Sequence, residues 1–304
     1  MLLLLEQLLN GVQFGVTLFL MSAGLTLIFG IMGVINLAHG SLYMIGAYAS
    51  AIIAARTGSA LPALLGGLAV AGVVGIAIEF FVMRRLYGRN HLDQVLATFA
   101  LILIINQGAT MLFGRQPLFV AMPAALNGSV MLLPGLVYPV YRLAVIALGL
   151  MVACGLFLLI NGTRVGMLVR AGATHREMVR ALGVDIRKLY TLVFGLGALL
   201  AGLAGIMAGP ILAVQVGMGE QILILAFVVV VIGGVGSVRG AFLGALVAGT
   251  VDTLMRAFLP GLFRHLMNGP DADALGSGLS SMGVYVLMAI VLLARPKGLF
   301  ARQA

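Results

Sequence analysis

The side chains that most often carry out catalysis or bind metals are sparse in this sequence, and their spacing matches no catalytic or metal-binding motif. The histidines stand singly, at His39, His91, His175 and His265, with no HExxH pattern. The lysines are Lys188, which follows Arg, and Lys297, which follows Pro, so no Gly-Lys pair exists and a Walker A phosphate-binding loop is excluded. We therefore expect a protein that is not an enzyme, that does not hydrolyse ATP by itself, and that needs no metal and no cofactor.

One stretch, GATHREMVRALGVDIRKLY at 172–190, collects six charged residues in a chain that is 62% hydrophobic and 9% charged. Thr174 and Glu177 have the spacing of a capping box, in which the two side chains satisfy free backbone amides at a helix start. Gly183 is a natural helix stop, and Asp185 can cap the next helix. The pattern predicts a helix of about two turns with a defined start and end.

The predicted short helix also has an apolar face, made by Met178, Val179 and Leu182, with Arg176 and Arg180 turned away from it. A loop that only fixes membrane topology needs scattered basic residues and no such face. A capped helix with an apolar face favours docking into a groove on a partner protein.

The rest of the chain has the composition of a membrane protein. Its 304 residues have a mean hydropathy of +1.17, and most of its uncharged stretches reach the roughly 20 residues that a helix needs to cross a bilayer. We predict an all-α polytopic membrane protein of about eight or nine transmembrane helices, some of them interrupted by glycine. The spans are expected at about 10–32, 41–55, 62–83, 94–113, 141–161, 189–210, 220–236, 240–259 and 278–294.

The net charge of +9 does not indicate nucleic-acid binding, because the basic residues are distributed as topology requires. If the C-terminal tail is cytoplasmic, most of them fall in cytoplasmic loops, above all in 84–92 and 162–190, as the positive-inside rule expects. The loops 114–140 and 260–278 then lie outside, the first with four prolines and room for a short hairpin. No basic residue fixes the side of Met1.

Two apolar segments, 24–50 and 227–249, are interrupted in similar ways by glycine and polar residues. Irregular backbone at membrane depth survives only where it is buried in protein or lines a wet cavity, and paired interruptions often mark a substrate path. Two tight turns between helices, with polar side chains that satisfy free backbone groups, are the alternative. The candidate path residues are Asn36, His39, Gly40, Tyr43, Gly233, Gly236 and Ser237.

Small residues recur every four positions in three segments, which favours close helix packing in lipid, or alternatively association with another subunit. These series are Ala63, Gly67, Ala71 and Gly75; Gly197, Ala201, Gly205 and Gly209; and Gly236, Gly240, Gly244 and Ala248.

The acidic residues within apolar segments are expected to be structural. Glu79 can pair with Arg84 or Arg85, and Asp252 with Arg256 four residues on. Both acids are expected near span ends, whereas a secondary transporter normally carries an acidic residue inside the membrane for ion coupling. A stand-alone secondary transporter and an intramembrane enzyme remain the less favoured alternatives.

In these segments the sequence resembles the branched-chain amino acid permease family of ATP-binding-cassette importers. The charged stretch 170–190 looks like that family's cytoplasmic coupling loop, in which a short helix followed by glycine docks on the ATPase. Three further segments match: GLTLIFGIMGVINLAHGSLYMIGAY (24–48), VVVVIGGVGSVRGAFLGALVAG (228–249) and LLARPKGLF (292–300). Together they cover most of the chain, and the NLAHG block is similar to the shorter of the two permease types.

The resemblance implies a single transmembrane permease domain, 1–304, with its coupling loop at 162–190. It implies a multi-pass protein of the bacterial inner membrane that forms half of a translocation pore with a second homologous permease. Two ATPase subunits and a periplasmic substrate-binding protein would complete the importer, and branched-chain or other hydrophobic amino acids are its implied solutes, with urea or short amides as alternatives. The residues implied in coupling to the ATPase are Thr174, Glu177, Met178, Leu182 and Gly183.

Overall fold

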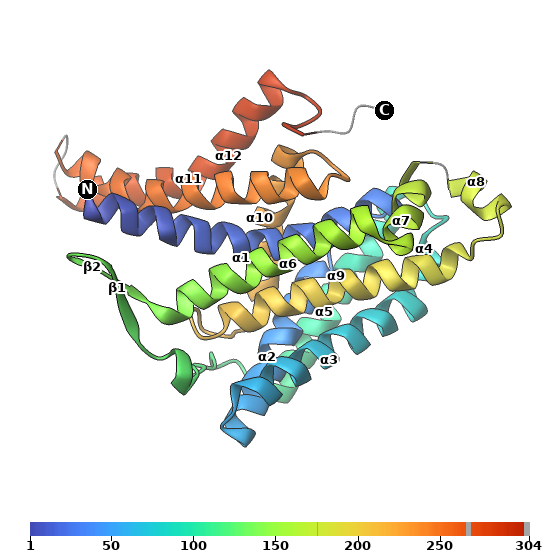
Figure 1. Ribbon diagram of the computed structural model, residues 1–304, viewed down its shortest axis with the longest axis horizontal. Helices are drawn as coiled ribbons and strands as arrows, with labels where there is room; N and C mark the ends of the chain where they lie inside the picture. The colour runs from blue at the N-terminus through green and yellow to red at the C-terminus, as the bar shows by residue number, and fades with distance from the viewer. Residues whose placement is uncertain (175, 266–268, 301–304) are drawn as a thin grey trace.

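The computed structural model describes residues 1–174, 176–265 and 269–300, which form a helix bundle with one small hairpin (Figure 1). Seven helices in this described part are long and apolar enough to cross a membrane. They are α1 (Leu2–Met32), α3 (Ala60–Ile78, continued by the π-helix Glu79–Met83 and α4, Arg84–Leu86), α5 (His91–Phe113), α6 (Val140–Gly162), α9 (Ile186–Ala208), α11 (Val238–Arg264) and α12 (Gly269–Ala294). The predicted all-α, polytopic membrane fold is confirmed.

The remaining elements are shorter or irregularly connected. Two helices, α2 (His39–Thr57) and α10 (Met218–Gly233), correspond to the two predicted spans that adjoin the glycine interruptions. The others are the 3₁₀ turn Ala124–Leu126, β1 (Ser129–Leu133), β2 (Leu136–Pro139), α7 (Arg164–Thr174) and α8 (Arg176–Ala181).

Helices α1 and α9 form the centre of the bundle. Most of their residues are buried, whereas α5 and α6 expose most of theirs. Helix α1 contacts α6, α9, α10 and α11, and α9 contacts α1, α2 and α3. A helix that is apolar on every side suits a buried position, and α1 has this character because residues 7–55 contain no charged side chain.

The helices around this centre approach one another at glycine, and the contacts include Gly205, which belongs to a predicted small-residue series. A Cβ added at Gly46 of α2 would lie 2.6 Å from the Cα of Gly202 in α9, and Gly205 packs directly on the Tyr43 carbonyl. A Cβ at Gly249 of α11 would lie 2.5 Å from the Cα of Gly15 in α1. Since lipid supplies no hydrophobic drive for helix association, such close backbone packing is the main source of cohesion.

Both interruptions are compact turns in which a polar side chain accepts a hydrogen bond from the backbone. Helix α1 ends at Gly33, whose φ of 65° needs glycine and whose N–H donates to Phe29 O. In the turn that follows, Asn36 Oδ1 accepts a hydrogen bond from Ala38 N at 3.1 Å. In the second interruption Ser237 Oγ accepts from Gly240 N at 3.0 Å and caps α11.

The predicted loops gather at two opposite ends of the bundle. Helices α7 and α8 lie at one end, here called the inner end, and the N-terminus and the β1–β2 hairpin lie at the other, the outer end (Figure 1). The tail joins the inner end, where Leu299 N donates to Ile232 O at 2.8 Å. At the outer end Tyr138 Oη donates to Asn10 Oδ1 at 3.1 Å, so the N-terminal part of α1 packs beside the hairpin.

The predicted span 220–236 differs from the helix observed there. Helix α10 has 16 residues, which give a length of about 24 Å, less than the roughly 30 Å of a bilayer core. Its second residue, Gly219, packs on the backbone of Gly40 at the start of α2. Helix α10 therefore begins against another helix start within the bundle and not at the outer surface.

We predict that Gly205→Ala destabilises the protein, because its new methyl group would meet the Tyr43 carbonyl. The matched control is Gly108→Ala in α5, where the new methyl group meets nothing within 4 Å. Thermal unfolding in detergent should show a loss of about 1–3 kcal/mol for Gly205→Ala and a neutral or slightly stabilising effect for Gly108→Ala. Equal stability of the two variants would contradict the packing described here.

Candidate functional site

The short helix α8 lies at the tip of the inner end, outside the bundle (Figure 1). It runs from Arg176 to Ala181, close to the two turns predicted. The capping-box prediction is wrong in one respect: Thr174 is the last residue of α7, and its hydroxyl donates to Arg170 O at 2.9 Å. Because Thr174 is helical, it cannot take the extended conformation of an N-cap. His175 lies outside the described residues.

The predicted stop at Gly183 is confirmed. Gly183 has a φ of 84°; its N–H donates to Arg180 O at 3.0 Å, and Val184 N donates to Val179 O at 3.3 Å. These two bonds form a Schellman motif, which ends a helix at a left-handed glycine. Asp185 then caps α9 as predicted, since its carboxylate accepts from the N–H groups of Arg187 and Lys188. Helix α8 is thus joined to the central helix α9 through a turn of defined geometry.

The side chains of α8 divide sharply by exposure. Val179 is 5% exposed and faces the protein, whereas Met178 is 61% and Leu182 78% exposed. Met178 and Leu182 are four residues apart, so they lie on the same side of the helix. Glu177 is exposed beside them. Two large apolar side chains held outward on a short helix that ends in a Schellman motif form a small surface suited to a partner's groove.

The start of α9 is fastened to α3 by a polar cluster around Glu79. This carboxylate is fully buried and pairs with Arg84 Nε at 3.0 Å, as predicted. It also accepts from the hydroxyls of Thr191 and Tyr87, each at 2.8 Å. Burial, and next the bond to Glu79, raise the pKa of Tyr87 above its ordinary value, so this phenol stays a donor. The cluster makes the inner ends of α3 and α9 a single unit.

The second predicted pair is also observed. Asp252 accepts two hydrogen bonds from Arg256 one helical turn later, at 2.8 and 3.0 Å. Both acids are therefore paired, as predicted. The expectation that both lie near span ends is wrong for Asp252, which is 14 residues from the start of α11 and 12 from its end.

The candidate path residues of the first interruption are buried inside the chain. Asn36 and His39 are 0% exposed and Tyr43 is 2% exposed. The His39 ring covers Gly24 of α1, where an added Cβ would meet it at 3.0 Å. Gly40 packs on Gly219 of α10, and this contact joins the starts of two helices. Within one chain these residues act as packing groups, and their part in a path stays a prediction.

The candidate residues of the second interruption lie at the inner end. Gly233 packs on Gly240, and Gly236 lies over Gly30 of α1. Ser237 caps α11 and lines, with Arg170 and Arg239, a cavity of about 390 Å³. The two interrupted segments therefore meet where Gly236 lies over Gly30, whereas the buried candidate residues Asn36, His39 and Tyr43 are not among those that line this cavity.

A carboxylate within the bundle was missed by the sequence analysis. Glu220, in the first turn of α10, accepts a hydrogen bond at Oε1 from Asn106 Nδ2 of α5 at 2.6 Å. Asn106 lies 15 residues from the inner end of α5 and 7 from its outer end, or about 22 Å and 10 Å along the helix axis. The sequence predicts Glu220 at the outer boundary of a span, whereas the start of α10 within the bundle places it at membrane depth. The unusual shortness of that apolar segment was the signal available.

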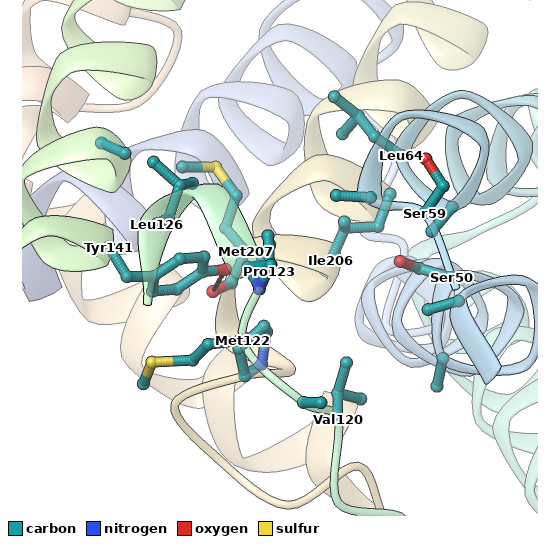
Figure 2. Close-up of a pocket in the computed structure, with 18 of the residues that line it drawn as sticks. Ser50, Ser59, Leu64, Val120, Met122, Pro123, Leu126, Tyr141, Ile206 and Met207 are labelled. Atoms are coloured by element: carbon teal, nitrogen blue, oxygen red, sulfur yellow. Dashed lines mark hydrogen bonds between the residues drawn. The ribbon is translucent and has the colours of Figure 1, made fainter. Parts of the chain in front are cut away.

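A second cavity, of about 500 Å³, lies at the outer end beneath the loop that contains Met122 and Pro123 (Figure 2). Ser50, Tyr141 and Ile206 are among its lining residues, none of which is charged. Figure 2 shows Tyr141 close to Met207, and its hydroxyl donates to Met207 O at 2.9 Å. The cavity is mainly apolar, with the hydroxyl groups of Ser50 and Ser59 but no charged side chain in its lining.

No group of three or more His, Cys, Asp or Glu side chains within the described ranges could hold a metal ion.

Comparison with known proteins identifies the family. A model described as "Branched-chain amino acid transport system / permease component" matches residues 7–294. The chain belongs to this permease family.

Curated relatives agree over nearly the full length of this permease. It is 31% identical to the high-affinity branched-chain amino acid transport system permease protein BraD of Pseudomonas aeruginosa, with 98% of this chain and 96% of BraD covered. Identity to LivH of Escherichia coli K12 is 28% with the same coverage. A probable LivH of Methanocaldococcus jannaschii is 27% identical over 93% of this chain and 88% of the relative. The chain is accordingly a multi-pass transport permease.

Proposed function

We propose that this permease forms half of the translocation pore of an ATP-binding-cassette importer in the bacterial inner membrane. It would pair with a second homologous permease, bind two ATPase subunits, and receive its solute from a periplasmic binding protein. The observation that carries this proposal is the exposed pair Met178 and Leu182 on α8, which is joined through Gly183 to the central helix α9. An isolated channel or enzyme has no need of such a surface.

In this proposal the inner end faces the cytoplasm and the outer end the periplasm. The basic loops 84–92 and 162–188 and the tail from Arg295 belong to the inner side, in agreement with the positive-inside rule. The loops 114–140 and 260–277, and the N-terminus beside the hairpin, belong to the outer side. ATPase subunits then reach α8 from the cytoplasm, and a binding protein meets the hairpin end.

The coupling residues have distinct roles. Met178 and Leu182 enter the ATPase groove, and Glu177 and Thr174 lie at its edge. Two backbone hydrogen bonds fix the helix end at Gly183, and its left-handed conformation suits no β-branched residue. A movement of the ATPase is thereby passed to α9 as a rigid-body displacement.

The proposed solutes are branched-chain amino acids, as the names of BraD and LivH suggest. The path runs between this chain and the second permease, along the faces that one chain leaves exposed. The buried residues Asn36, His39, Gly40 and Tyr43 support its wall, and Gly233, Gly236 and Ser237 support its cytoplasmic mouth. No ion-coupled transport and no enzymatic step is proposed.

We predict that Met178→Asp and Leu182→Asp each reduce transport at least tenfold at normal abundance. A carboxylate desolvated in the docking groove without a partner costs several kcal/mol, and the substitutions lie outside the membrane. Gly183→Val should act in the same direction by straining the helix end. The measurements are co-purification of the ATPase subunits and uptake of radiolabelled leucine. Arg180→Lys is the matched control, since it keeps the charge on the same helix, and it should be mild. Normal uptake by both Asp variants would mean that the loop only fixes topology.

Deletion of the gene should abolish high-affinity uptake of a narrow group of solutes. We predict that leucine, isoleucine and valine compete with one another for the lost uptake and that urea in excess does not. Restoring the gene should restore all three activities together. Competition by urea or short amides alone would assign the importer to those solutes instead.

A further inference from the structure

The pair Glu220 and Asn106 has an incomplete set of hydrogen bonds. One carboxylate oxygen of Glu220 accepts from Asn106 Nδ2, and the other lies beside Gly217, where an added Cβ would be 3.5 Å away. Asn106 Oδ1 is buried and accepts no hydrogen bond from the residues that the structure describes. The pair thus presents two acceptor oxygens, one of them charged, and lacks a donor. Its chemistry calls for a cation that carries N–H groups.

The depth of this pair excludes contact with lipid. The neighbouring side chains of Gln107 and Gln221 are exposed in the single chain. Asn106 lies well inside the length of α5, so these polar side chains are exposed at a level within the membrane. Carboxylate and amide groups facing hydrocarbon at this depth are costly, and intramembrane acids therefore face protein or a watery passage. This face of α5 and α10 must lie toward the second permease or the path between the two.

Apolar side chains flank the pair on the same helix faces. Leu103 precedes Asn106 by three residues and is 55% exposed, and Ile224 follows Glu220 by four and is 51% exposed. Residues at these spacings lie side by side on a helix. A charged acceptor pair is therefore bordered by two exposed aliphatic groups.

We propose that Glu220 and Asn106 bind the ammonium group of the amino acid in transit, while Leu103 and Ile224 contact its aliphatic side chain. This site rests on the proposed function and assigns the solute's recognition within the membrane to named residues. The outer cavity fits this role less well, because no carboxylate lines it to neutralise an ammonium group.

The test uses the complete importer in proteoliposomes, with Cys154→Ala and a reporter cysteine at Gln221. Two thiol reagents of similar size are compared, a cationic trimethylammonium-ethyl and an anionic sulfonato-ethyl methanethiosulfonate, and labelling of this chain is followed by mass spectrometry. We expect the cationic reagent to label the cysteine about tenfold faster than the anionic one, because a nearby carboxylate in a passage of reduced dielectric attracts a cation by about this factor. Glu220→Gln should bring the ratio near one, and Glu220→Asp should keep it. Leucine under turnover should slow labelling.

Glu220→Gln is isosteric and still offers Asn106 an acceptor, so the fold should persist. Leucine uptake should fall at least tenfold, while ATP hydrolysis stimulated by the loaded binding protein continues. A second reporter at Gln107 gives the same readout from α5. Absence of labelling at both reporters, or a reagent ratio unchanged by Glu220→Gln, would overturn the site even if the parent complex transports leucine with ATP. Loss of ATP-dependent uptake in the parent complex would instead contradict the proposed function.

Discussion

The contact between the bare backbones of Gly40 and Gly219 is the constraint on which the rest of this structure depends. It joins the first turns of α2 and α10, which begin within the bundle after irregular segments. The free backbone N–H groups at a helix start are costly to expose to lipid, so protein has to cover them. Only two glycines allow this approach, and the same contact sets the position of Glu220, the next residue along α10. Packing and site geometry therefore follow from one crossing point.

From that point a continuous series of contacts leads to the inner surface. Helix α2 packs on α9 where Gly46 meets Gly202 and where Tyr43 meets Gly205. At its inner end α9 is fastened to α3 through Glu79 and is entered directly from α8 through Gly183 and Asp185. A displacement of α8 thus acts on the central helix α9, which packs on α2, and the start of α2 packs on the start of α10 beside Glu220. Rigid helices with close backbone contacts are suited to transmit such a movement without deformation.

Much of this architecture could be predicted from sequence, for physical reasons that differ among its parts. Long uncharged segments predicted the spans because lipid imposes a minimum length, and Gly183 and Asp185 predicted helix boundaries because capping is a local interaction. The role of Thr174 could not be predicted, since α7 extends farther than local capping signals suggest. Glu220 was missed because its depth depends on a tertiary contact, the approach of Gly219 to Gly40, that no local pattern contains. The burial of His39 likewise follows from a tertiary contact, that of its ring with Gly24 of α1.

The central claim is that this permease moves solute only when ATPase subunits drive it. The most direct measurement is leucine uptake into proteoliposomes that hold the two permeases, with the ATPases and the loaded binding protein added or omitted, and with ionophores to collapse proton and sodium gradients. We predict uptake that requires both ATPase subunits and hydrolysable ATP and that is unaffected by the ionophores. Uptake by the permeases alone, driven by an ion gradient and abolished by the ionophores, would contradict it.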